Sequence, residues 1–406
     1  MNKNIKLAVA GAVLALSATA NAGIIIPAGD WTVDIGGNVN SFIANVDTET
    51  TSAAGVRTKS SANNTIGTGL LPSALGIGAK TRQNDVDTAI QFTFFTGSSS
   101  GAAGVGNRAN GGGAGSNSLN IRQAFLTFGD KSWGTFKLGR DLGIFGSDAI
   151  LSDMTLLGVG TGGQLHGGSS TLGRIGSGYI YADWKGQVSY STPNFNGFQI
   201  SAGVMENFGS ANQAQKDMSY EAKATYDFAA DAVNGRIWVS GLSQKSEGLG
   251  AVAFTNATQG TAQVLGYAAG NTYTSRGIDI GAKVSAGPAS LVGYYYEGKG
   301  LDGQNALQGI FNANGVKADD SGGYVQGTYV LPSQTKVGVS FGRSNSKHTV
   351  SAFDIENESW VVGAYHPLTK HLNLVTEYTA QEVKNKLAGQ TQTERDTISV
   401  GAILFF

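Results

Sequence analysis

Three things are scarce in this sequence of 406 residues: cysteine, charge and long apolar runs. There is no cysteine, so disulfide bonds cannot stabilise the chain and its stability must have another source. Charged residues make up 14% of the chain, well below the roughly 25% that is usual for soluble domains. After residue 22 no apolar run approaches the roughly 20 residues that a spanning helix needs, which excludes a helical membrane protein.

The first residues have the order of an export signal. Two lysines precede an apolar stretch at residues 7–16, and a small-residue triplet follows at residues 20–22. The apolar stretch is about ten residues long, which is too short for a membrane anchor. We therefore predict a cleaved signal peptide over residues 1–22 and a mature chain over residues 23–406.

The charge balance gives no support for a nucleic-acid partner. The formal charge is -1, and loss of the two signal-peptide lysines lowers it to about -3, so there is no global basic field to attract phosphates. We also expect no cofactor and no metal, because the four histidines lie outside any metal-ligand or nucleophile motif. These histidines are His166, His348, His366 and His371.

Glycine is abundant, with 60 residues, and together with tyrosine and phenylalanine it is typical of many short strands joined by turns. Several segments alternate apolar and polar residues with a period of two. Their apolar members include Val39 and Ile43; Ile90, Phe92 and Phe94; Tyr220 and Tyr226; Ile278 and Ile280; and Val337, Val339 and Phe341. A soluble sandwich also alternates, but here charge falls almost only on the polar parity, which favours a barrel with a lipid-facing exterior and a wet lumen.

Connections alternate between short turns and long loops, which is the pattern of outer-membrane barrels. We expect the short turns near residues 84, 129–131, 193–197, 231–235, 287–288, 332–333 and 367–370. We expect the long loops at residues 47–73, 97–117, 141–177, 246–273, 300–320 and 345–357. The fold class is therefore all-β, a transmembrane antiparallel β-barrel of about 16 strands.

Several segments resemble the Gram-negative general porin family. Residues 122–125 (Arg-Gln-Ala-Phe) and 133–140 are similar to the hairpin that leads into the family's inward-folded third loop, and residues 191–198 resemble the strand-turn-strand signature that follows it. The last strand, 397–406, ends with Phe406, where family members present a signal to the barrel-insertion machinery. The resemblance implies a passive channel for ions and small hydrophilic solutes. It also implies a homotrimer in outer-membrane lipids and lipopolysaccharide, with loop 97–117 at the position of a latch over the neighbour.

The resemblance also implies a constriction in which loop 141–177 folds inward against basic wall residues. Arg122 shares the parity of Ala124, opposite to Phe125, so we expect it to point into water and to face Asp153. Arg140 has the opposite parity to Lys137, which favours the loop entrance over the wall. The expected constriction residues are Arg122, Lys137, Arg140, Asp148, Asp153, Asp183 and Lys185. Compared with the family, both the acidic and the basic rows are incomplete, so selectivity of either sign stays open.

Other functional classes make different demands on the sequence. A barrel enzyme would need a nucleophile, a base and an orienting acid, and no motif supplies them, so we expect no enzyme. A substrate-specific channel stays open as the alternative and would line its lumen with an aromatic track or a dense cluster of one charge. An adhesin or other soluble β protein would tolerate charge on both strand parities and need not end in phenylalanine.

Overall fold

The computed structural model describes residues 23–98, 119–161, 170–207, 213–249, 252–255, 262–265, 269–301, 318–347, 354–386 and 392–406. The predicted signal peptide and nearly all of the predicted latch loop lie outside these residues. Among the described helices, none is long and apolar enough to cross a membrane.

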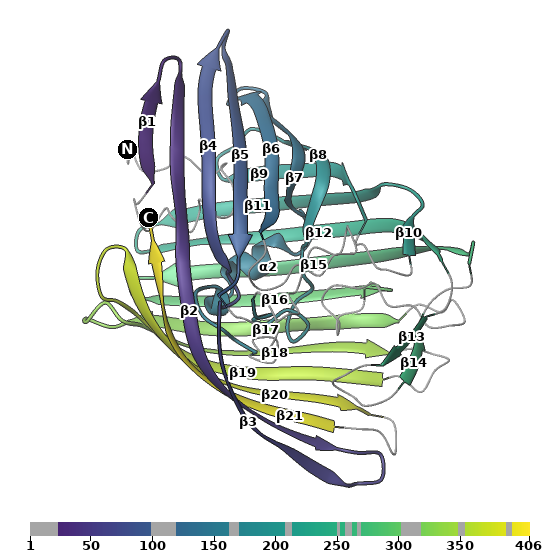
Figure 1. Ribbon diagram of the computed structural model, residues 1–406. Helices are drawn as coiled ribbons and strands as arrows, with labels where there is room; N and C mark the ends of the chain where they lie inside the picture. The colour runs from purple at the N-terminus through teal and green to yellow at the C-terminus, as the bar shows by residue number, and fades with distance from the viewer. Residues whose placement is uncertain are drawn as a thin grey trace.

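Along the described residues the elements form a succession of strands that is interrupted once by two short helices (Figure 1). The first half contains β1 (Ile24–Ala28), β2 (Trp31–Thr51), β3 (Arg57–Gly67), β4 (Ser73–Gln83), β5 (Val86–Thr96), β6 (Asn120–Asp130), β7 (Gly134–Leu142), α2 (Ser147–Ser152), η2 (Met154–Leu157), β8 (Trp184–Ser191), β9 (Phe198–Met205) and β10 (Gln213–Gln215). The second half contains β11 (Ser219–Ala230), β12 (Val233–Gly248), β13 (Val252–Thr255), β14 (Ala262–Leu265), β15 (Thr272–Ala286), β16 (Ala289–Lys299), β17 (Asp319–Val330), β18 (Lys336–Lys347), β19 (Asp354–Pro367), β20 (Leu372–Asn385) and β21 (Gln392–Phe405).

The wall is a closed antiparallel β-barrel of 16 strands, which confirms the predicted architecture and strand number. β3 and β4 both pair with β2 and together form one interrupted wall strand. The last strand closes the barrel, because β21 pairs with β2 from Asn38↔Phe405 to Thr51↔Gln392. The two ends of the described chain therefore lie close together (Figure 1).

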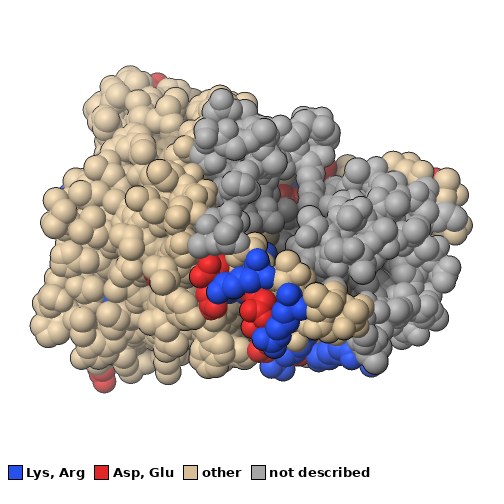
Figure 2. Space-filling view, turned by 60° about the horizontal axis from the view of Figure 1, so that its bottom comes forward, with Lys and Arg blue, Asp and Glu red and all other residues tan. Residues whose placement is uncertain are grey.

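The predicted alternation separates two environments on the wall. On β2, Val39 and Ile43 are 60% and 61% exposed, whereas Phe42 and Ala44 are 1% and 0% exposed. The exposed apolar parity faces outward and the other parity faces the interior, as a barrel in lipid requires. Figure 2 shows a face on which most of the described surface carries neither acid nor base, with charges of both signs gathered in one stretch.

The structure confirms the predicted short turns between strands. Between β4 and β5 the chain reverses at Asn84 and Asp85, which both adopt positive φ, 48° and 61°. Asparagine and aspartate tolerate this left-handed conformation better than other residues with a side chain, and it matches the twist of a two-residue hairpin. The turns after β11, β15, β17 and β19 also lie where the sequence predicts them.

The predicted long loop at residues 47–73 is wrong. β2 continues to Thr51, the chain turns at residues 52–56, and β3 begins at Arg57. The polar composition that suggests a loop belongs to strand ends, where polar side chains bond one another across strands, as Asn45 does to Asn64 at 3.0 Å. A short irregular segment at residues 68–72 then separates β3 from β4.

Candidate functional site: the lumen and its inward loop

The segment between β7 and β8, residues 143–183, folds into the barrel. It carries α2 and η2, and its side chains include Phe145 at 1% and Ala149 at 0% exposure. The inward position of the predicted loop 141–177 is therefore confirmed, although the described loop continues to Asp183 and residues 162–169 lie outside the described part. We call residues 143–183 the inward loop.

Carboxylates of the barrel wall hold the inward loop by its backbone. Glu221 accepts hydrogen bonds from the N–H groups of residues 144 and 145, both at 2.8 Å, and Asp279 accepts one from residue 146 at 3.1 Å. On the other side of the barrel, Glu377 accepts from residues 159 and 160, both at 2.7 Å. These three acids therefore hold the beginning of the inward loop and its middle.

Neutral groups and one arginine make further hydrogen bonds between the inward loop and the wall. Gln326 accepts from the backbone N–H of Met154 at 2.7 Å, and the Tyr324 hydroxyl donates to the carbonyl of Ala149 at 2.7 Å. Arg174, which is fully buried, donates to the carbonyls of Ser340 and Ser359 on β18 and β19. The loop is therefore tied to the wall along its described length.

The break between β3 and β4 is a docking point for the same loop. The N–H of Leu70 donates to the carbonyl of Gly158 at 2.9 Å, and the N–H of Thr171 donates to the carbonyl of Gly69 at 3.1 Å. A Cβ at Gly69 would collide with the Gly158 carbonyl, so glycine permits this close backbone approach. The irregularity in the wall strand thus coincides with the place where the loop crosses.

Asp148 is the predicted loop acid that meets basic wall residues. Its carboxylate contacts Lys223 at 2.5 Å and Arg236 at 3.1 Å, and Arg236 also pairs with Asp227 at 2.6 Å. Burial acts to raise the pKa of Asp148, but the charges and hydrogen bonds of Lys223 and Arg236 outweigh it and hold that pKa below its ordinary value. Asp148 is therefore an ionised link between α2 and strands β11 and β12.

Arg122 and Asp153 do not face each other in the described structure. Asp153 is 4% exposed and accepts hydrogen bonds from Thr155 and from the Tyr179 hydroxyl within the inward loop. Arg122 lies where the β5–β6 register shifts, and its guanidinium sits 4.8 Å from the ring centre of Phe95. A bulge of this kind re-aims a side chain, which the simple alternation of the sequence does not reveal.

The predicted parity of β6 is also wrong. Ala124 lies opposite Phe92, which is 43% exposed on the outer face. Gln123 is instead buried inside and bonds to Thr93 and Asp141, and Lys137 lies 5.0 Å from the ring centre of Phe125. Phe125 therefore belongs to the interior parity and Ala124 to the exterior.

The other predicted site residues lie at the two ends of the inward loop. Lys137 forms an ion pair with Asp141, and Arg140, as predicted, is on the opposite parity, in register with Ala124 and Gly186.

Asp183 has a φ of 59°, and its carbonyl accepts from the N–H of Gly143 at 2.8 Å where the loop returns to the wall. Lys185 pairs with Glu221 at 2.5 Å in a buried ion pair. That these residues form a constriction stays a prediction.

Sequence analysis misses the wall residues that matter most for seating the loop. Glu221, Asp279 and Glu377 all lie on strands with clear period-two alternation, at polar positions facing the interior. The sequence feature that could have identified these three residues is a charged side chain at an interior-facing position of a wall strand. Which loop atom each charge meets depends on contacts over 76 to 218 residues of sequence separation.

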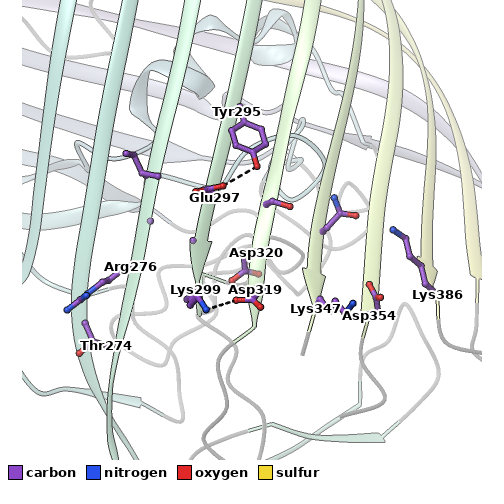
Figure 3. A pocket seen from close by; sticks show the side chains of 15 residues that line it. Thr274, Arg276, Tyr295, Glu297, Lys299, Asp319, Asp320, Lys347, Asp354 and Lys386 are labelled. Atoms are coloured by element: carbon purple, nitrogen blue, oxygen red, sulfur yellow. Dashed lines mark hydrogen bonds and ion pairs between the residues drawn. The ribbon is translucent and has the colours of Figure 1, made fainter. Parts of the chain in front are cut away.

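A separate cavity of about 1160 Å³ lies near the ends of β15–β19 (Figure 3). Arg276, Lys299, Asp319, Lys347 and Asp354 follow one another in register across these strands. The lining includes outward residues such as Tyr295, which is 49% exposed, and it contains acids and bases in equal number. This cavity is therefore on the outer side of the wall and is not the passage through the barrel.

Among the described residues, no group of three or more His, Asp or Glu side chains could hold a metal ion. What the geometry offers is a closed barrel with an apolar exterior, a polar interior and a loop fixed across that interior. These features define a channel of the outer membrane, set in lipid by its strands.

The comparisons with known proteins agree. The chain belongs to the Gram-negative porin family, whose model matches residues 7–386. No curated protein matches the sequence. Three similar solved structures are the outer-membrane channel DcaP of Acinetobacter baumannii (14% identity, TM-score 0.66, covering 95% of this chain and 100% of that one), an anion-selective porin from Comamonas acidovorans (17%, 0.58, 93% and 100%) and a trimer form of OmpT from Vibrio cholerae (14%, 0.55, 93% and 99%). The protein is thus an outer-membrane channel for the diffusion of small solutes.

Proposed function

We propose that this channel is unspecific, with the inward loop as its constriction, and that it catalyses no reaction. The observation that supports this is the burial of the interior aromatic rings. Trp238, Tyr294, Tyr296, Tyr324 and Tyr365 all face the lumen, yet each is 5% exposed or less, because they lie in one buried cluster that includes residues of the inward loop. A substrate-specific channel needs such rings in contact with the solute, and here they are buried.

Liposome swelling with sugars of graded size tests this proposal. An unspecific channel gives rates that fall smoothly with solute size, because only the width of the passage discriminates. A rate for one sugar far above that of others of equal size would contradict unspecific diffusion and favour the substrate-specific alternative. Liposomes prepared with heat-denatured protein serve as the control for leakage.

The same proposal includes processing and assembly. We infer that the signal peptide, residues 1–22, is removed on export, that Phe406 addresses the mature chain to the barrel-insertion machinery, and that three copies assemble in outer-membrane lipids and lipopolysaccharide. Support for the trimer comes from the family and from the trimer form of the similar OmpT structure. Light scattering of the detergent-solubilised protein should give three times the mass of the mature chain, and the mass of one chain would contradict the trimer.

A further inference from the structure

Basic side chains in one half of the lumen face water, whereas most acids of the lumen are buried or paired with arginine. Lys80, Lys223, Arg236, Lys283 and Lys336 lie on the interior parity of β4, β11, β12, β15 and β18, toward the short turns. We call these five residues the basic row. Lys80 and Lys283 are exposed, and the side chain of Arg236 is 37% exposed.

Most interior acids are withdrawn from the passage, and two that stay exposed, Asp87 and Asp227, are paired with Arg82 and Arg236. Glu221, Asp279 and Glu377 are 2%, 1% and 3% exposed, and their oxygens already accept N–H and O–H groups of the inward loop and wall. Asp148 is 5% exposed beneath Lys223 and Arg236. A solute in the lumen therefore meets positive charge at the surface, while most of the compensating negative charge is covered.

Three members of the basic row, Lys80, Lys283 and Lys336, form no ion pair with an acid among the described residues, whereas Lys223 and Arg236 do. Lys336 lies over the ring of Tyr365, with its Nζ 4.5 Å from the ring centre. Lys283 is also directly in register with Arg236 on the neighbouring strand. Like charges opposite each other destabilise a sheet, so the fold alone gives no reason for this arrangement.

We propose that the basic row makes the channel prefer anions, so that its favoured solutes are small carboxylates, phosphates and inorganic anions. This inference rests on the proposed diffusion function and adds the charge class of the solute. Charges of one sign that line a narrow passage with low-dielectric walls raise the local concentration of the opposite ion. The passage does not bind the anion tightly, because the five side chains come from five separate strands rather than from one cluster.

Reversal potentials of the purified channel in a planar bilayer under a KCl gradient test this proposal. The wild-type protein should give the sign of anion preference, and its size should grow as the total salt is lowered, because screening weakens. The double variant Lys283→Gln/Lys336→Gln should lower the anion-to-cation permeability ratio by on the order of twofold to fivefold, since a unit charge met at contact in water is worth a factor of that order. Lys283→Glu/Lys336→Glu should move the potential further in the same direction.

Lys299→Gln/Lys347→Gln, at the outer cavity of Figure 3, is the matched control, because it removes the same charge outside the lumen and should leave the reversal potential unchanged. A wild-type potential of zero or of the cation sign overturns the anion preference while leaving diffusion intact. Folded wild-type protein that conducts no ions overturns the diffusion function itself. Equal shifts in the lumen variant and the control also overturn the role of the basic row. The wild-type measurement decides the sign of the preference even if the variants fail to fold.

Discussion

Phe92 and Ala89 lie three residues apart on β5 and face different solvents. Phe92 is 43% exposed on the outer face, while Ala89 pairs with Lys80 and Thr127 on the interior parity. An arginine at a midplane lipid-facing position costs roughly 2–4 kcal/mol, whereas the lumen is wet. We expect Phe92→Arg to reduce the yield of folded barrel strongly and Ala89→Arg to reduce it little, as measured by heat-modifiable mobility on a gel. Equal losses would contradict the parity of β5.

Asp148 offers a second prediction at the scale of one residue. Its replacement by asparagine frees Lys223 and Arg236 from a negative partner, so Asp148→Asn should shift the reversal potential further toward anions. Because the pKa of Asp148 is lowered, its contribution to stability is present above the ordinary aspartate pKa and is lost only as the pH falls through the lower folded value. The difference in reversal potential between Asp148→Asn and the wild type should therefore persist from pH 7 to about 4, because Asp148 stays ionised there. A shift toward anions near pH 4, with no effect of Asp148→Asn at pH 7, would contradict this assignment.

At the scale of elements, the contact between the β3–β4 break and the inward loop is sensitive to a single methyl group. Gly69→Ala places a Cβ against the Gly158 carbonyl, so the loop must move away from the wall there. We expect a larger single-channel conductance and faster swelling with the larger sugars. Gly293→Ala on β16, where a Cβ meets no atom within 4 Å, is the matched control and should behave as the wild type. Unchanged conductance in folded Gly69→Ala would refute the loop as the constriction.

The elements also explain why prediction from the sequence succeeds in some places and fails in others. Alternation and turn residues are local, so most of the strands follow from the sequence, whereas the inward fold of the loop is what the resemblance to the porin family implies. The interior position of Phe125 could not be predicted from the sequence, because one bulge at Arg122 shifts the parity of β6. The hydrogen bonds that Glu221 and Glu377 accept from the loop backbone could not be predicted either, because they join the loop to strands that are distant from it in sequence.

At the scale of the whole molecule, closure of the barrel and the position of the inward loop together determine which interior side chains stay exposed. The inward loop covers aromatic rings and acids of β12 and β15–β20 and is tied to β3–β4 as well. The side chains that line the solute path are therefore those that the loop leaves uncovered. Among them, the basic row supplies most of the unpaired charge. A sequence count of lumen charges misses this asymmetry, because it does not show which charges are buried or paired.

The last residue joins closure of the molecule to its assembly. Phe406 donates its N–H to the carbonyl of Gly37 at 3.1 Å and accepts from the N–H of Gly37 at 2.9 Å, so it extends the closing pair of strands. Phe406→Gly removes the ring and retains both backbone hydrogen bonds, whereas deletion of Phe406 removes all three. If the ring is the insertion signal, both variants should be exported and cleaved after Ala22, yet both should give far less heat-modifiable barrel in the outer-membrane fraction. Phe406→Trp, which keeps a terminal aromatic ring, should restore the yield. Wild-type yield from Phe406→Gly together with a loss on deletion would assign the effect to strand closure and remove the ring from the assembly step.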